Sequence, residues 1–195
     1  MPDSNRVLIL ASSSPYRAEL LDRLGLDYTT ASPDIDESAL PGERPDTLVE
    51  RLAELKARAV GEHHPGLIIG SDQVATIDGD ILGKPGNHGN AVEQLTRLSG
   101  KRVTFHTGLC LLDTTRHELQ ADVVPFTVQF RRLSPEQIER YLRAEQPYNC
   151  AGSFKSEGLG ITLFEKMSGE DPTALIGLPL IRLTTMLGNA GILLP

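Results

Sequence analysis

Residues 8–21 read LILASSSPYRAELL, an apolar run followed by three serines, a proline and a helical pattern. The run predicts a strand, and Pro15 suits the first position of a helix because its fixed φ and missing N–H cost nothing there. Ser14 is a typical N-cap residue. The N–H groups of the first turn, the serine hydroxyls and Arg17 would then surround an anion such as a phosphate. From this stretch alone, a serine-capped helix with Arg17 in solvent remains the alternative.

The length and composition favour one domain over residues 1–195. Its net charge of −7 disfavours nucleic acid polymers and anionic membranes as partners, so an anionic ligand must be held by local cations. The apolar run at residues 7–11 is too short for a signal peptide or a membrane span, and we expect a cytoplasmic protein. Cys110 and Cys150 lack CxxC spacing and are expected to be free thiols.

Patterns of apolar residues and turn signals predict the remaining elements. Strands are expected at 28–31, 67–74, 102–112 and 119–132, and helices at 15–25, 46–63, 91–98, 135–145 and after Gly177-Leu178-Pro179. The last helix should bury Leu180, Leu183 and Leu187. In the helix at 46–63, the expected core positions are Leu48, Leu52, Leu55 and Ala59. Lys56 and Arg58 are by default on its solvent face.

Asp72 interrupts the apolar run LIIGSDQV at residues 67–74, which resembles a central strand buried on both faces. A carboxylate there requires a cation, a metal or a proton, which makes Asp72 the best candidate for a catalytic residue. The alternative is that Asp72 only ends the strand. Asp78-Gly79 predicts a hairpin turn, and we expect a three-residue turn with a bulge, because that register places Lys84 beside Asp72.

Two polar loops complete the set of candidates. The loop at 32–45 carries Asp34, Asp36 and Glu37, which are either solvated carboxylates or oxygen ligands for a cation such as Mg²⁺. Residues 149–158, NCAGSFKSEG, place small residues around Lys155 and Glu157, as expected where backbone closely approaches a ligand.

Several of these motifs, taken in order, resemble those of the Maf family of nucleoside triphosphate pyrophosphatases. They are residues 11–17, Lys56, Gly70-Ser71-Asp72, Gly83-Lys84-Pro85 and Gly177-Leu178-Pro179. The resemblance implies an α/β, inosine-triphosphate-pyrophosphatase-like fold, with a mixed twisted sheet flanked by helices and a central cleft between two lobes. It also implies a divalent metal cofactor and a tendency to form homodimers. By resemblance, Asp72 is the proton acceptor, Glu37 is a carboxylate beside the site, and the phosphates contact Ser12, Ser14, Arg17, Lys56 and Lys84.

The subfamily is indicated by a departure from the family pattern. Tyr16 replaces the first of two arginines, and with Gln73 and residues 150–158 it resembles the subfamily that hydrolyses 7-methyl-GTP. A cationic 7-methylguanine would stack on Tyr16 with about 0.5–2 kcal/mol. Its N1–H and N2 amino groups would donate to Glu157. The alternatives are that Tyr16 packs over its own helix and that Glu157 pairs with Lys155.

The expected reaction is metal-assisted hydrolysis between the α- and β-phosphates of a nucleotide. Asp72 would activate water or, with Glu37, hold Mg²⁺, Mn²⁺ or Co²⁺, and Lys155 could join the other cations at the phosphates. One alternative is the same reaction on dTTP or UTP. Another is a nucleotide-binding protein that regulates septum formation in cell division and hydrolyses little of the nucleotide it binds.

Overall fold

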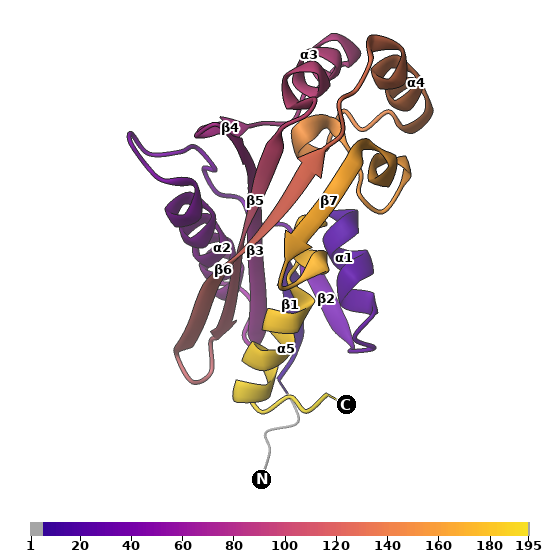
Figure 1. Cartoon of the computed structure of the whole chain (residues 1–195). Coiled ribbons are helices and arrows are strands. Elements are labelled where there is room, and N and C mark those ends of the chain that lie inside the picture. The colour runs from indigo at the N-terminus through magenta and orange to yellow at the C-terminus, as the bar shows by residue number, and fades with distance from the viewer. Residues whose placement is uncertain (1–5, 195) are drawn as a thin grey trace.

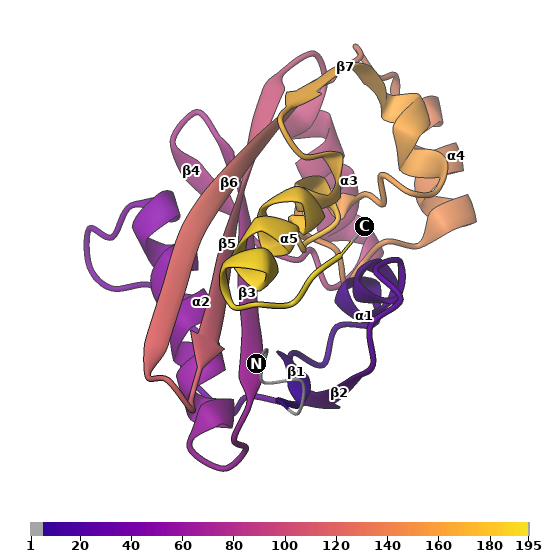
Figure 2. The same ribbon diagram turned by 90° about the horizontal axis from the view of Figure 1, so that it is seen from below.

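A computed structural model describes residues 6–194 and contains a seven-stranded mixed sheet with helices on both faces (Figures 1 and 2). The strands are β1 (Leu8–Ala11), β2 (Tyr28–Ala31), β3 (Leu67–Ile77), β4 (Asp80–Leu82), β5 (Arg102–Asp113), β6 (Glu118–Phe130) and β7 (Phe164–Gly169). The α-helices are α1 (Pro15–Asp22), α2 (Pro45–Gly61), α3 (His88–Leu98), α4 (Pro135–Glu145) and α5 (Leu180–Asn189). The 3-10 helices are η1 (Ala151–Ser153), η2 (Leu159–Leu163) and η3 (Pro172–Leu175).

The sheet has the order β2-β1-β3-β5-β6-β7, with β4 paired to β3. Strands β2, β1 and β3 are parallel, whereas β3, β5, β6 and β7 are antiparallel, which confirms the expected mixed sheet. Figure 1 shows α3 and α4 beyond one end of the long strands and α1, β1 and β2 toward the other, so the two expected lobes share the central strands. Within residues 6–194, no helix is both long and apolar enough to cross a bilayer.

The two faces of the sheet are covered by different helices, as Figure 2 shows for α2 and α5. Alternate residues of β3 face opposite sides, so Ile68 packs with α2 while Leu67 and Ile69 pack with α1 and α5. The expected core residues of α5, Leu180, Leu183 and Leu187, are buried. Strand β3 is therefore covered on both faces, as its continuous apolar run predicts.

Helix α2 contacts the sheet through small residues, because two glycines allow its backbone to approach closely. A Cβ at Gly70 would overlap the Ala53 carbonyl oxygen, and one at Gly108 would overlap the Val49 carbonyl oxygen. Of the expected core positions of α2, Leu48 and Leu52 are buried, whereas Leu55 is exposed and Ala59 only half-buried. The buried positions of the helix are 48, 49, 52, 53, 56, 57 and 60.

We expect Gly70→Ala to lower the free energy of unfolding by about 3 kcal/mol, because the added methyl group pushes α2 away from β3. Thermal and denaturant unfolding measure this change. Gly188→Ala is the control, since its Cβ would meet nothing within 4 Å on the exposed side of α5 and should raise stability by up to about 1 kcal/mol. An unchanged midpoint for Gly70→Ala would contradict the close approach of α2.

The predicted bulge in the β3–β4 hairpin was wrong. Ala75 pairs with Leu82 and Ile77 with Asp80, so the turn has two residues. Asp78 and Gly79 have φ values of 51° and 90°, as a type I′ turn requires. Strand β4 ends before Lys84, and the cation that pairs with Asp72 is Lys56 on α2.

Most predicted elements lie within a few residues of their observed bounds, but β7 and the three 3-10 helices were missed. Ser14 caps α1 and Pro15 begins it, as expected. Strand β7 pairs with β6 through the sequence FEKMSG, which is mostly exposed after the buried Phe164 and has no regular alternation of burial.

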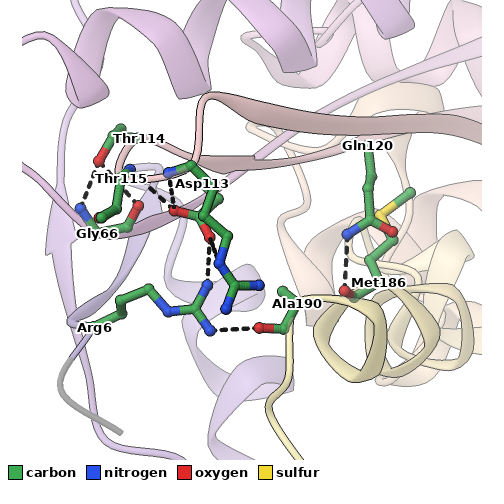
Figure 3. A network of polar contacts seen from close by, with 9 residues as sticks. Arg6, Gly66, Asp113, Thr114, Thr115, Gln120, Met186 and Ala190 are labelled. Carbon is green, nitrogen blue, oxygen red and sulfur yellow. Dashed lines mark hydrogen bonds and ion pairs between the residues drawn. The ribbon is translucent and has the colours of Figure 1, made fainter. Parts of the chain in front are cut away.

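A buried ion pair closes the end of the sheet away from α3 and α4 (Figure 3). Arg6 donates to Asp113 at the end of β5 and to the carbonyl oxygen of Ala190 after α5. Asp113 also accepts from the backbone N–H groups of Thr115 and Arg116, at 3.0 and 3.1 Å. This network joins the start of the described chain, the β5–β6 turn and α5.

Candidate active site

A cavity of about 520 Å³ lies between the two lobes. Its wall includes residues 11–17 from the β1–α1 turn, Lys56 from α2, residues 72–74 from β3 and residues 81–84 from the β4 end. Residues 149–151 and Phe154, Ser156 and Glu157 form part of the remaining wall. Every predicted site residue except Lys155 lines this cavity.

The serine turn after β1 orients polar groups at the cavity. Ser12 Oγ accepts hydrogen bonds from Ser14 N at 3.1 Å and from an Arg17 guanidinium nitrogen at 3.3 Å. Both lone pairs of that hydroxyl are thereby used, so its proton is available to donate to an anion. Ser14 Oγ accepts from Arg17 N at 3.5 Å and caps α1.

Arg17 lies in the cavity wall rather than in solvent, so the alternative reading of its motif was wrong. Its Nε donates to the Gly177 carbonyl oxygen at 2.8 Å, which connects α1 to the loop before α5. Burial lowers the pKa of Arg17, and the Asp72 and Glu37 carboxylates oppose this effect. The guanidinium still remains charged near neutral pH.

Asp72 and Lys56 form a buried ion pair on the face of β3 that α2 covers. Lys56 Nζ lies 2.7 Å from Asp72 Oδ1 and 2.7 Å from Glu37 Oε1. The exposed fraction of the side chain is 6% for Lys56 and 11% for Asp72, but 59% for Glu37. The default placement of Lys56 on the solvent face was therefore wrong, whereas Arg58 is exposed as expected and pairs with Glu54.

The loop that carries Glu37 is fastened to α2 by a residue that sequence patterns did not single out. Arg51 donates to both carboxylate oxygens of Glu43, at 2.6 and 2.7 Å, and to the Ser38 carbonyl oxygen at 3.0 Å. Glu43 in turn accepts from Leu40 N at 2.9 Å. Arg51 thus holds the loop at two points, Ser38 and Glu43.

The pKa of Glu37 reflects its position at the cavity. Burial alone would raise this pKa, but the hydrogen bond and charge of Lys56, together with Lys84 and Arg17, hold it below its usual value. Glu37 is consequently an anion at neutral pH. Of the three loop acids, the structure brings this one to the cavity wall.

Gln73 points to the face of β3 opposite Asp72. Its Nε2 donates to Thr107 Oγ1 at 3.0 Å and to the carbonyl oxygens of Ala174 and Leu175 at 2.6 and 3.2 Å. These bonds fix η3 against β3 and β5, and they leave the Gln73 carbonyl oxygen as the group that a ligand could contact. Lys84 lines the cavity just after β4.

Tyr16, on α1, and Glu157, in the segment 149–157, both line the cavity. Lys155 Nζ is 5.9 Å from the centre of the Tyr16 ring and 3.7 Å from Glu145 Oε1. The alternative reading, in which Glu157 pairs with Lys155, was therefore wrong, because Lys155 pairs with Glu145. Cys150 Sγ is 4.0 Å from the Tyr16 hydroxyl, and Cys110 is buried; both are free thiols.

The charged residues of the cavity wall are three cations and three carboxylates: Arg17, Lys56, Lys84, Glu37, Asp72 and Glu157. Their formal charges sum to zero. The negative charge of a bound polyphosphate would therefore not be neutralised by these side chains. Residues 6–194 contain no group of three or more His, Cys, Asp or Glu side chains able to hold a metal alone. Two carboxylates fit Mg²⁺, which commonly keeps several waters and binds substrate phosphates.

The geometry defines an α/β protein with a polar cleft, whose wall contains the buried Lys56–Asp72 ion pair and the serine turn before α1. Residues 7–190 match the Maf-like protein family, and the chain belongs to that family.

Known proteins support this assignment over the full length. The chain is 60% identical to "7-methyl-GTP pyrophosphatase" of Nitrosococcus oceani, over 94% of this chain and 93% of the relative. It is 58% identical to the protein of the same name from Alcanivorax borkumensis, over all of both chains. A HAM1 protein from Coxiella burnetii has a similar fold, with a TM-score of 0.53 at 15% identity over 94% of this chain and 99% of that one.

Proposed function

We propose that this protein is a 7-methyl-GTP pyrophosphatase, which hydrolyses N7-methylguanosine 5'-triphosphate to 7-methyl-GMP and diphosphate. The observation that carries the proposal is Asp72, a carboxylate buried in the cavity wall with one oxygen held at 2.7 Å by Lys56. Full-length relatives at about 60% identity bear that name. The substrate is a free nucleotide rather than a nucleic acid polymer, and the enzyme acts in the cytoplasm.

Hydrolysis requires a water aligned with the α-phosphate and a group that takes its proton. Asp72 provides that group, because Lys56 fixes Oδ1 and so orients Oδ2 for the water. Arg17 and Lys84 contact the phosphates, and Ser12 donates its hydroxyl proton to them. Lys155 is assigned a different place, near Tyr16 and outside the cavity wall.

A divalent cation, Mg²⁺, Mn²⁺ or Co²⁺, completes the proposed site. Asp72 and Glu37 would hold it together with the substrate phosphates, and it would neutralise phosphate charge and acidify bound water. The zero formal charge of the wall supports this requirement.

The base is selected by Tyr16 and Glu157, which also line the cavity. The Tyr16 ring provides a face for a cationic purine, and Glu157 provides two acceptor oxygens for its N1–H and N2 amino groups. A pyrimidine presents a carbonyl oxygen at the equivalent edge and is repelled by the carboxylate.

A substrate screen tests the proposal. We expect kcat/KM for 7-methyl-GTP to exceed that for GTP by about 2- to 30-fold, since the two differ in the stacked positive charge, which contributes roughly 0.5–2 kcal/mol. The preference over dTTP and UTP should be larger, because these bases also lack the matched edge. Released diphosphate is measured with Mg²⁺, Mn²⁺ or Co²⁺ and with a chelator, which should stop turnover. Faster hydrolysis of dTTP or UTP would identify a pyrimidine nucleotide pyrophosphatase, and tight binding without turnover would identify a nucleotide-binding regulator.

A further inference from the structure

Glu145, the last residue of α4, holds both ends of the loop that carries Glu157. Its Oε2 accepts a hydrogen bond from the N–H of Leu159 at 2.7 Å. Its Oε1 lies 3.7 Å from Nζ of Lys155. Glu157 is midway between these two contacts, so a single carboxylate restrains the loop on either side of it.

The loop is packed tightly around this carboxylate. A Cβ at Gly158 would lie 2.7 Å from Glu145 Oε2, so the loop backbone passes close to this carboxylate. The hydroxyl oxygen of Tyr141, one turn earlier on α4, accepts a hydrogen bond from the backbone N–H of Lys155 at 3.1 Å. Helix α4 therefore fixes the path of residues 155–159.

The position of Glu145 is unfavourable for a carboxylate in a helix considered alone. The negative end of the helix dipole lies at the C-terminus, where an acidic side chain is destabilised. The Glu145 side chain is also only 16% exposed. Its contacts with Leu159 and Lys155 offset these costs, and they connect the residue to the loop rather than to α4 itself.

We propose that Glu145 is a positioning residue for base recognition, which acts by holding Glu157 at the purine edge. This inference rests on the proposed function, because it requires Glu157 to contact the base. Glu145 does not line the cavity, whereas Glu157 does. Loosening the loop should weaken nucleotide binding while the phosphate end, around Asp72, stays intact.

The test is a comparison of Glu145→Ala and Glu145→Gln by steady-state kinetics with 7-methyl-GTP. We expect Glu145→Ala to raise KM about tenfold with kcat within about twofold, as for loss of binding energy present equally in the ground and transition states. Glu145→Gln should recover most of the affinity, because its amide oxygen still accepts the Leu159 N–H. Glu136→Ala is the control, since that exposed residue lies in the first turn of α4 and contacts Ser134.

A double-mutant cycle separates positioning from general support of the fold. If Glu145 acts through Glu157, then Glu145→Ala should have no further effect on KM in the Glu157→Ala protein. Additive effects, an equal fall in kcat, or an unchanged KM for Glu145→Ala would each overturn the inference. A wild-type protein that does not hydrolyse 7-methyl-GTP would instead refute the proposed function.

Discussion

Replacement of Asp72 with asparagine is expected to lower kcat by roughly 10²–10⁴-fold, the range that general base catalysis contributes. The amide preserves the shape of the side chain but cannot take a proton from water. Lys56 keeps Glu37 as its partner at 2.7 Å, so the folded structure should persist. Diphosphate release measures the rate, and circular dichroism with thermal unfolding checks the fold.

Asp80→Asn is the matched control for this prediction. Asp80 lies in the same hairpin, but its side chain is exposed and pairs with Arg97 on α3. Its replacement should leave kcat unchanged. An Asp72→Asn protein that keeps more than about a tenth of wild-type activity would remove Asp72 from the chemical step.

The sequence predicts the region around Asp72 well because it contains strong local signals. Apolar continuity in residues 67–74 is unusual for a strand exposed to water, and a carboxylate within it requires compensation. The Ser14-Pro15 junction is equally local, since capping depends on three or four adjacent residues. Both predictions are confirmed by the structure.

The partner of Asp72 could not be predicted from hairpin geometry, because it comes from a contact distant in sequence. Lys56 is oriented by the phase of α2, and that phase depends on Gly70 and Gly108 meeting the helix backbone. One sequence signal was present: Leu48, Leu52, Lys56 and Val60 recur at intervals of four residues, as on one helix face. The expectation that Leu55 is a core residue placed Lys56 on the solvent face instead.

The loops were harder to predict for the same reason. Arg51 holds the loop of Glu37 from α2, and Glu145 holds the loop of Glu157 from α4, and neither pairing has a characteristic spacing. Lys155 was expected at the phosphates, but the structure places it between Tyr16 and Glu145. In each case the loop is held by an ion pair with a neighbouring helix, Arg51 with Glu43 and Glu145 with Lys155.

The second large effect expected concerns stability rather than rate. Lys56→Met should lower the free energy of unfolding by about 3–5 kcal/mol, the usual result of removing one partner from a buried ion pair. The methionine fills the volume of the lysine stem, but Asp72 is left as an uncompensated anion beneath α2. Glu37 suffers less, since it is 59% exposed and can reach water.

The double variant Lys56→Met with Asp72→Asn distinguishes the ion pair from simple packing. Because the neutral amide no longer requires a cation, the double variant should be more stable than Lys56→Met alone, although both lack activity. Urea unfolding of the four proteins gives the coupling energy. Lys101→Met is the control, because Lys101 pairs with Asp78 at 2.8 Å in solvent and its loss should change stability little. If Lys56→Met and Lys101→Met lose equal stability, the buried Lys56–Asp72 pair contributes no more to the free energy of unfolding than an exposed pair. The argument that a buried carboxylate requires this cation would then fail.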